Sequence, residues 1–175
     1  MKHILFSLAA ALLLLAGCET GPKTYNYQDL SFTYPATYTV EDEKITDGRV
    51  SLIVSKDDDN FMIVNIIPLD EDLIEEFDRS DIQSSIEEDA LDLLMMDLDD
   101  EEMEIDKDSI NALSSPEGSV PGILLSYDGT YFGDPFKGRI SVTVLRNYQI
   151  ILKYEATNDK ALDEMTGIAT SFNVE

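Results

Sequence analysis

Alternating apolar residues near the C-terminal end constrain the fold of this chain more than any other feature. Residues 139–145 and 148–155 each place apolar side chains at every second position. Residues two apart in a strand lie on the same face, so both segments are predicted to be strands. Arg146-Asn147 between them is typical of a tight hairpin turn, in which Asn147 can adopt a positive φ.

Three more segments, residues 30–34, 50–54 and 122–131, alternate in the same way and are also predicted to be strands. Residues 61–67 differ, because they read FMIVNII and are almost continuously apolar. Such a run is expected of a central strand that is covered on both faces.

In the segments between these strands, apolar residues have the spacing that is typical of helices. Apolar residues recur every three or four positions at 82–94, behind a capping-box pattern S-x-x-Q that begins at Ser80. The same spacing occurs at 69–77, and again at 161–172 behind Asn158, which we expect to cap that helix. Runs of strands broken by helices predict an α+β fold, with a mainly antiparallel sheet flanked by helices.

The N-terminus has the features of a lipoprotein signal peptide. Lys2 and His3 precede an apolar run over residues 4–16, which is too short to span a membrane. Gly17 and Cys18 follow, and Cys18 is the only cysteine. This end resembles a bacterial lipobox, in which the cysteine thiol carries the lipid. A plain signal peptide with an incidental cysteine is the alternative.

These features predict three parts: a signal peptide at 1–17, a lipidated cysteine with its tether at 18–25, and one globular domain at 26–175. Two or three acyl chains of the palmitate type would give stable membrane anchoring. We therefore expect a lipoprotein of the bacterial cell envelope. Glu19 stands where Asp would be an inner-membrane retention signal, which favours the outer membrane in a bacterium that has two membranes.

Cleavage before Cys18 would also remove His3, the only histidine, and the chain has no Trp. A Cys nucleophile, a Ser-His-Asp triad and zinc held by His or Cys are then excluded from the mature protein. We expect a protein that is not an enzyme and has no cofactor. Paired carboxylates acting as acid and base in a hydrolase are the enzymatic alternative.

Negative charge is concentrated in the middle of the chain. The 36 Asp and Glu outnumber the 12 Lys and Arg, and 21 of the acids but only one base, Arg79, fall within residues 57–106. Nucleic-acid binding is excluded, because it needs a basic surface to neutralise phosphates. The charge indicates cations or a protein partner with a basic surface.

Acidic residues at two places could contribute oxygen ligands to Ca²⁺. The candidates are Asp57, Asp58, Asp59, Asp97, Asp99 and Glu101. The first three form a turn with Asn60, for which a solvated hairpin is the alternative. The others have the spacing of a calcium loop but lack its central Gly and its final Glu, so we expect at most weak Ca²⁺ binding.

Apolar residues exceed one helix face at Leu94-Met95-Met96 and Leu98. Apolar surface could therefore remain for a partner. A helix packed on two sides is the alternative.

The segment LSFTYP at residues 30–35 resembles the opening strand of the PsbP/Mog1-like family. The hairpin at 139–155 and the closing helix up to residues 168–174 resemble the end of that family's domain. The resemblance implies an α/β/α sandwich and an accessory or assembly protein that binds other proteins. Ion contacts in photosynthetic members involve His, which the mature chain would lack, so no functional residue is carried over.

Together these features indicate a membrane-anchored lipoprotein with a non-enzymatic, protein-binding or assembly accessory domain and an acidic face. The alternative is a divalent-cation-binding protein or a carboxylate-based hydrolase.

Replacing the lipid-bearing cysteine tests the predicted anchor. We expect Cys18→Ala to move the protein from the membrane pellet to the soluble fraction and to abolish metabolic labelling with palmitate, because no other residue can take the thioether-linked lipid. Glu19→Gln, which keeps the thiol, should stay in the pellet. A Cys18→Ala protein that remains in the membrane fraction contradicts the prediction.

Overall fold

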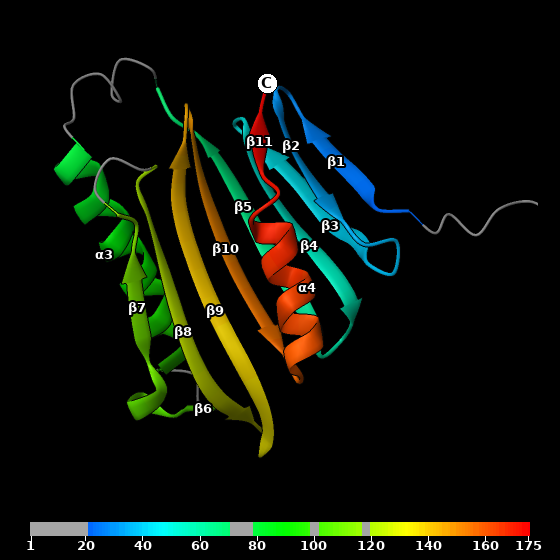
Figure 1. Cartoon of the computed structure of the whole chain (residues 1–175), viewed down its shortest axis with the longest axis vertical. Coiled ribbons are helices and arrows are strands. Elements are labelled where there is room, and N and C mark those ends of the chain that lie inside the picture. The colour runs from blue at the N-terminus through cyan, green and yellow to red at the C-terminus, as the bar shows by residue number, and fades with distance from the viewer. Residues whose placement is uncertain (1–20, 71–78, 99–101, 117–119) are drawn as a thin grey trace, which may run out of the picture.

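The computed structural model describes residues 21–70, 79–98, 102–116 and 120–175. A large antiparallel sheet forms its centre, with strands in the order β3-β4-β5-β10-β9-β8-β6, and β7 also pairs with β8 (Figure 1). The strands are β3 (Thr39–Thr46), β4 (Arg49–Asp57), β5 (Asn60–Pro68), β6 (Met103–Ile105), β7 (Asn111–Ser114), β8 (Gly122–Tyr131), β9 (Asp134–Leu145) and β10 (Tyr148–Ala156).

A smaller sheet has the order β1-β2-β11. It consists of β1 (Lys23–Tyr27), β2 (Leu30–Tyr34) and β11 (Asn173–Val174). It therefore joins the beginning of the domain to its end. Stacked aromatic rings also link these two ends of the domain. The ring centroid of Phe32 lies 5.1 Å from that of Tyr25 and 4.7 Å from that of Phe172.

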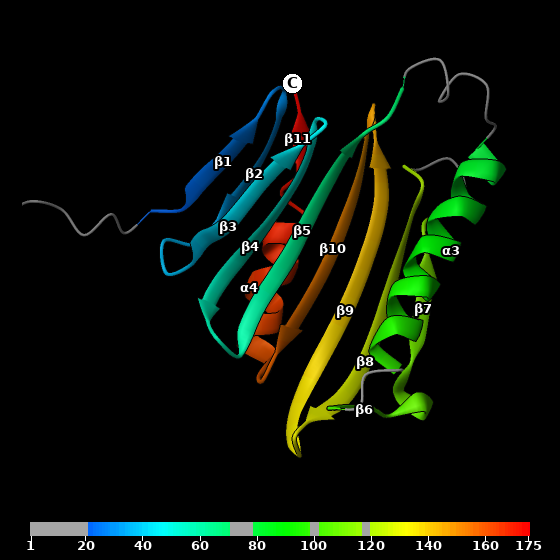
Figure 2. The ribbon, with the colours of Figure 1, turned by 180° about the vertical axis from the view of Figure 1, so that it is seen from behind.

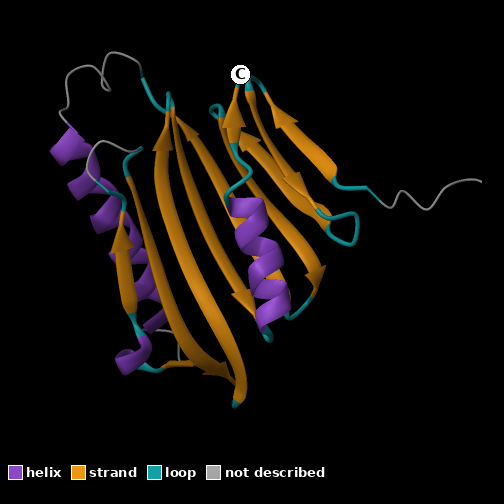
Figure 3. Ribbon diagram, in the orientation of Figure 1, coloured by secondary structure: helices purple, strands orange, loops and turns teal. Residues whose placement is uncertain are grey.

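Two helices, α3 (Arg79–Leu98) and α4 (Asp159–Ala169), cover opposite faces of different halves of the large sheet, as Figures 1 and 2 show from the two sides. Helix α4 packs on β4, β5 and β10, whose inward side chains form one core with the small sheet. Helix α3 packs on β8 and β9 and forms a second core. A short 3-10 helix, η2 (Lys107–Ser109), follows β6. Figure 3 shows the predominance of strands.

The β5–β10 pairing joins the two halves. Its register runs from Phe61 opposite Glu155 to Pro68 opposite Tyr148. Adjacent residues of β10 face different helices, because Ile150 belongs to the α4 core and Ile151 packs against the α3 core. One strand thus contributes to both layers, as the pleat requires.

The predicted α+β architecture and its antiparallel sheet are confirmed. Helix α4 begins as predicted, with the Asn158 side chain accepting a hydrogen bond from the Ala161 N–H at 3.0 Å. The hairpin turn differs in detail, because the positive φ of 52° belongs to Arg146 and not to Asn147. Strand β1 begins at Lys23, inside the segment that we predicted as tether. The predicted helix at 69–77 falls mostly outside the described residues.

Two further predictions are corrected. Among the described residues, β5 is fully covered on one face only: Met62, Val64 and Ile66 are fully buried, while alternate residues are partly buried. Ser80 does not cap α3, because the helix already includes Arg79. The Gln83 amide instead binds β8, where it accepts from the Gly122 N–H at 3.2 Å and donates to the Gly122 carbonyl at 3.1 Å. Among the described residues, no helix has the length and hydropathy to cross a membrane.

Leu152 tests the α4 core, since its side chain is 1% exposed. We expect Leu152→Ala to lower the free energy of unfolding by about 2–5 kcal/mol, through lost burial and the cavity left behind. Ile53→Ala removes as many carbons from a half-exposed position and should cost less than about 1.5 kcal/mol. Urea denaturation measures both, and equal losses would contradict the assignment of the core.

Candidate functional site

Half of one sheet face carries isoleucines among polar residues, and no described helix covers most of it. This half lies on the α3 side of β4, β5 and β10, to one side of the helix (Figure 2). Ile53 is opposite Ile63, which is opposite Lys153, and the next row pairs Asn65 with Ile151. All five side chains are only partly buried. Ser51 and Ser55 of β4 share this face with them. A solvated sheet face is normally polar, so the isoleucines are the feature that favours a contact here. We call it the open face.

The diagonally opposite quadrant shows the usual pattern. On the α4 side of β8 and β9, beyond the reach of most of α4, the partly buried residues include Ser126, Ser141 and Thr143. Arg139 on the same side donates a hydrogen bond to Thr166 of α4. Leu124 lies on that side too, so the open face is only the more apolar of the two quadrants that lack a described helix.

A pocket of about 430 Å³ lies at one end of the open face. Phe61 and Ile63 of β5 and Phe136 of β9 contribute apolar and aromatic wall. Its charged residues are Asp58, Asp59, Asp134, Glu155 and Lys153. An apolar wall with convergent charged groups is the usual composition of a binding pocket.

Lys153 stands at the boundary between the open face and the half that α3 covers. Its ammonium lies 2.5 Å from Asp97 Oδ1 and 3.3 Å from Glu155 Oε1. The Tyr127 hydroxyl donates to the other Asp97 oxygen at 2.9 Å. Burial alone would lower the pKa of Lys153, but the Asp97 hydrogen bond and the two carboxylate charges outweigh it and raise the pKa. Lys153 therefore stays charged and fixes the last turn of α3 to β10.

Asp97, one of the weak Ca²⁺ ligands proposed from the sequence, lies near the end of α3. The structure places Asp97 inside α3, 7% exposed and paired with Lys153. Its companions Asp99 and Glu101 lie outside the described residues. Glu104, farther along the chain, belongs to β6, which pairs with β8.

The second group of acids, Asp57, Asp58 and Asp59, forms the β4–β5 turn and is exposed. Asp57 Oδ1 accepts from the Asp59 N–H at 3.2 Å and from the Asn60 amide at 2.5 Å. Within residues 21–70, 79–98, 102–116 and 120–175, no three His, Cys, Asp or Glu side chains are grouped to hold a metal ion. Ca²⁺ binding stays a prediction.

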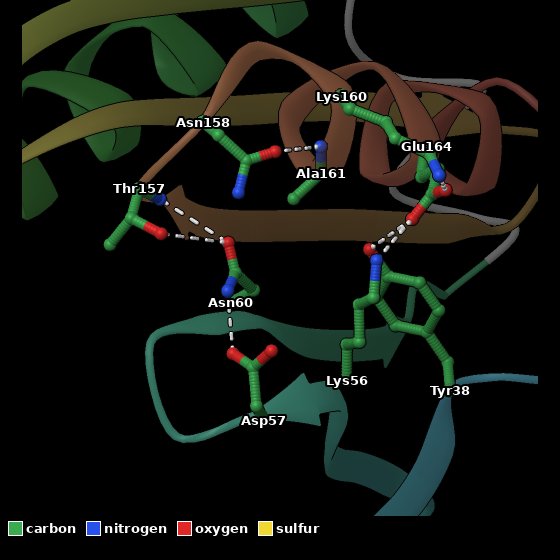
Figure 4. Close-up of polar contacts among 9 residues, drawn as sticks. All are labelled: Tyr38, Lys56, Asp57, Asn60, Thr157, Asn158, Lys160, Ala161 and Glu164. Atoms are coloured by element: carbon green, nitrogen blue, oxygen red, sulfur yellow. Dashed lines mark hydrogen bonds and ion pairs between the residues drawn. The ribbon is translucent and has the colours of Figure 1, made fainter.

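Polar contacts fasten this turn to the beginning of α4 (Figure 4). The Asn60 side-chain oxygen accepts from the Thr157 N–H at 3.2 Å. Glu164 of α4 accepts from the Lys56 ammonium at 3.2 Å and from the Tyr38 hydroxyl at 3.1 Å. Because both ends of the turn are held, Asp58 and Asp59 are fixed at the rim of the pocket.

The β8–β9 hairpin contributes two aromatic rings to the pocket. Tyr131 and Phe132 line the pocket, and their ring centroids lie 4.7 Å apart. Phe132 is 72% exposed. It also has a φ of +50°, followed by +90° at Gly133. A bulky residue at positive φ is strained, and Asn or Gly would relieve that strain.

The outer face of α3 carries a second exposed apolar group. Leu91, Met95 and Met96 are each more than half exposed, while Leu94 is buried against the sheet. Glu88 and Asp92 are exposed beside them. These side chains leave apolar surface on α3 that the described residues do not cover.

No protein-family model matches the sequence, and no curated protein matches it. Among solved structures, cyanobacterial PsbP (CyanoP) from Synechocystis sp. PCC 6803 is similar, with a TM-score of 0.59 and 19% identity over 93% of this chain and 99% of that one. The chain has a PsbP-like fold. A protein from Bacteroides thetaiotaomicron VPI-5482 also matches, with a TM-score of 0.50 and 10% identity, over 87% of this chain and 48% of that one.

The resemblance predicted from residues 30–35 and from the end of the chain is thus confirmed at the level of fold. The pocket was not predicted. Its components come from turns far apart in the sequence, and only the apolar run at 61–67 indicated that this face was unusual.

Glu164 gives a pH test of the contacts that hold the β4–β5 turn. Burial alone would raise its pKa, but the hydrogen bonds from Lys56 and Tyr38 outweigh it and the pKa is lowered. A lowered carboxyl pKa stabilises the fold above the ordinary value of 4.5, and this stabilisation is lost as pH falls through the folded pKa.

We therefore expect Glu164→Gln to lower the free energy of unfolding by about 1 kcal/mol or less at pH 7, since the group is partly exposed. The difference from the unsubstituted protein should shrink as pH falls below 4.5 and through the lowered pKa of Glu164. Urea denaturation across this pH range measures it, with Asp163→Asn on the same helix as control. A difference that is independent of pH would contradict the assignment.

Proposed function

We propose that this protein is a lipid-anchored accessory domain of the bacterial envelope that binds a protein partner with a basic, amphipathic surface. Cys18 would be the anchor, and the outer face of α3, defined by Glu88, Leu91, Asp92, Met95 and Met96, would be the contact. The proposal treats the domain as non-enzymatic.

One observation carries this proposal: exposed apolar side chains stand among carboxylates on a helix whose only base is Arg79. Leu91 and Met95 are four residues apart and so lie one above the other on the same face. Flexible methionines adapt well to a partner's surface. The neighbouring carboxylates favour a partner that is basic around its apolar centre, both in affinity and in rate of encounter.

The PsbP-like fold is compatible with such a role and does not specify it, because one fold hosts many functions. A hydrolase could use buried carboxylates as acid and base. The buried carboxylates of Asp97 and Glu155 instead form ion pairs with Lys153. We therefore rank protein binding above the carboxylate-based alternative. Cation binding at the exposed acids stays a separate prediction, and calorimetry with Ca²⁺ tests it.

Co-purification from detergent-solubilised envelope tests the proposal. We expect a partner that is recovered at low salt, is lost at high salt, and has a basic surface. Replacing Leu91, Met95 and Met96 together by Gln should reduce its recovery by about tenfold or more, equivalent to about 1.4 kcal/mol, without unfolding a helix that tolerates Gln well.

Leu113→Gln is the matched control, because Leu113 on β7 is 64% exposed and lies away from α3's outer face. It should leave recovery unchanged. A partner that binds the triple variant as well as the unsubstituted protein would exclude the outer face of α3 as the contact.

A further inference from the structure

The open face and its pocket lie apart from the outer face of α3 and need their own explanation. Row by row, the open face continues the apolar surface that α3 covers farther along the sheet: Ile151 is opposite Val142 of the α3 core, and Lys153 is opposite Ile140. The sheet therefore carries apolar side chains on both sides of Lys153, but a described helix covers only one side.

The charges around the pocket indicate what would cover it. Four carboxylates line it, from Asp58, Asp59, Asp134 and Glu155, against the single ammonium of Lys153. That ammonium is already held by Asp97 and Glu155. The three aspartates are exposed at the rim, so the entrance is negative while the floor of Phe61 and Ile63 is apolar. A ligand that satisfies both parts has a hydrocarbon stem and a cationic end.

The aromatic hairpin makes the choice of cation more specific. Phe132 presents an exposed ring and lines the same pocket as the aspartates of the β4–β5 turn. A guanidinium stacks on an aromatic face and binds carboxylates with several N–H groups at once, whereas an ammonium is a compact and strongly hydrated charge.

We propose that this pocket binds an arginine side chain that belongs to an extended segment of a protein partner. The arginine stem lies on Phe61 and Ile63, and the guanidinium lies between Phe132 and the rim aspartates. Neighbouring aliphatic residues of the segment cover Ile53 on the open face. This second contact goes beyond the proposed function, and it can fail while the outer face of α3 still binds its partner.

Calorimetry on the full-length lipoprotein in neutral detergent tests the proposal, with the peptide acetyl-Gly-Arg-Val-Ile-Gly-amide as the probe. A second peptide replaces Arg with citrulline, which keeps the shape and removes the charge. N-acetylarginine amide supplies the side chain without a segment. We expect the Arg peptide to bind about tenfold or more tightly than either of the other two, and more weakly as salt is added.

Phe132→Asn separates binding from folding, because Asn accepts the positive φ better than Phe does. It should leave the melting temperature equal or higher while weakening the Arg peptide about fivefold or more. Asp58→Asn with Asp59→Asn should weaken it similarly and flatten its salt dependence. Asp163→Asn on α4 and Leu113→Asn on β7 are the matched controls and should change nothing.

Three results would overturn the proposal. Equal affinity for the Arg and citrulline peptides would exclude recognition of the cation, and no heat up to about 1 mM Arg peptide would exclude the site. Binding of N-acetylarginine amide as tight as that of the peptide would make a free guanidinium compound the ligand. The triple Gln variant of α3 should bind the Arg peptide normally, so the outcome is independent of the test of the outer face.

Discussion

The pairing of β5 with β10 is the constraint on which the rest of the structure depends. It joins a meander from the first half of the chain to one from the second, and it fixes which side chains of β10 point to each helix. Because α3 and α4 then lie on opposite faces and over different strands, each face keeps a quadrant without a described helix. The open face is a direct consequence of this arrangement, and its isoleucines make it the more apolar of the two quadrants.

Prediction from the sequence succeeded where a residue's environment is set by its near neighbours. Alternation identified β4, β8, β9 and β10, and Asn158 identified the beginning of α4, since both are local effects. It failed where the environment comes from distant residues. The run at 61–67 does place apolar residues on both faces of β5, but no local sequence pattern indicates that α3 does not extend over this strand. Asp97 is buried because Lys153, 56 residues away, neutralises it.

Lys153 connects the stability of the fold with the character of the site. Buried ion pairs add little net stability, but removing one partner leaves a buried charge and is costly. With Asp97, Glu155 and Tyr127 gathered around one ammonium, the end of α3 is fixed and the charge of Lys153 is balanced locally. The aspartates at the pocket rim therefore keep their own charge available for a ligand. The candidate site could not be predicted from the sequence, because the β4–β5 turn, the β8–β9 hairpin and the end of β10 come together only in the folded chain.

The start of β1 at Lys23 leaves only residues 19–22 between the proposed lipid on Cys18 and the first strand. Four residues reach about 14 Å when fully extended, so the small sheet would rest near the bilayer surface. Helix α3 lies toward the opposite edge of the large sheet, and β3 to β8 alone spans roughly 24 Å of strand spacing. Such a molecule would be attached to the membrane at one edge and would hold α3 at the other edge, away from the point of attachment.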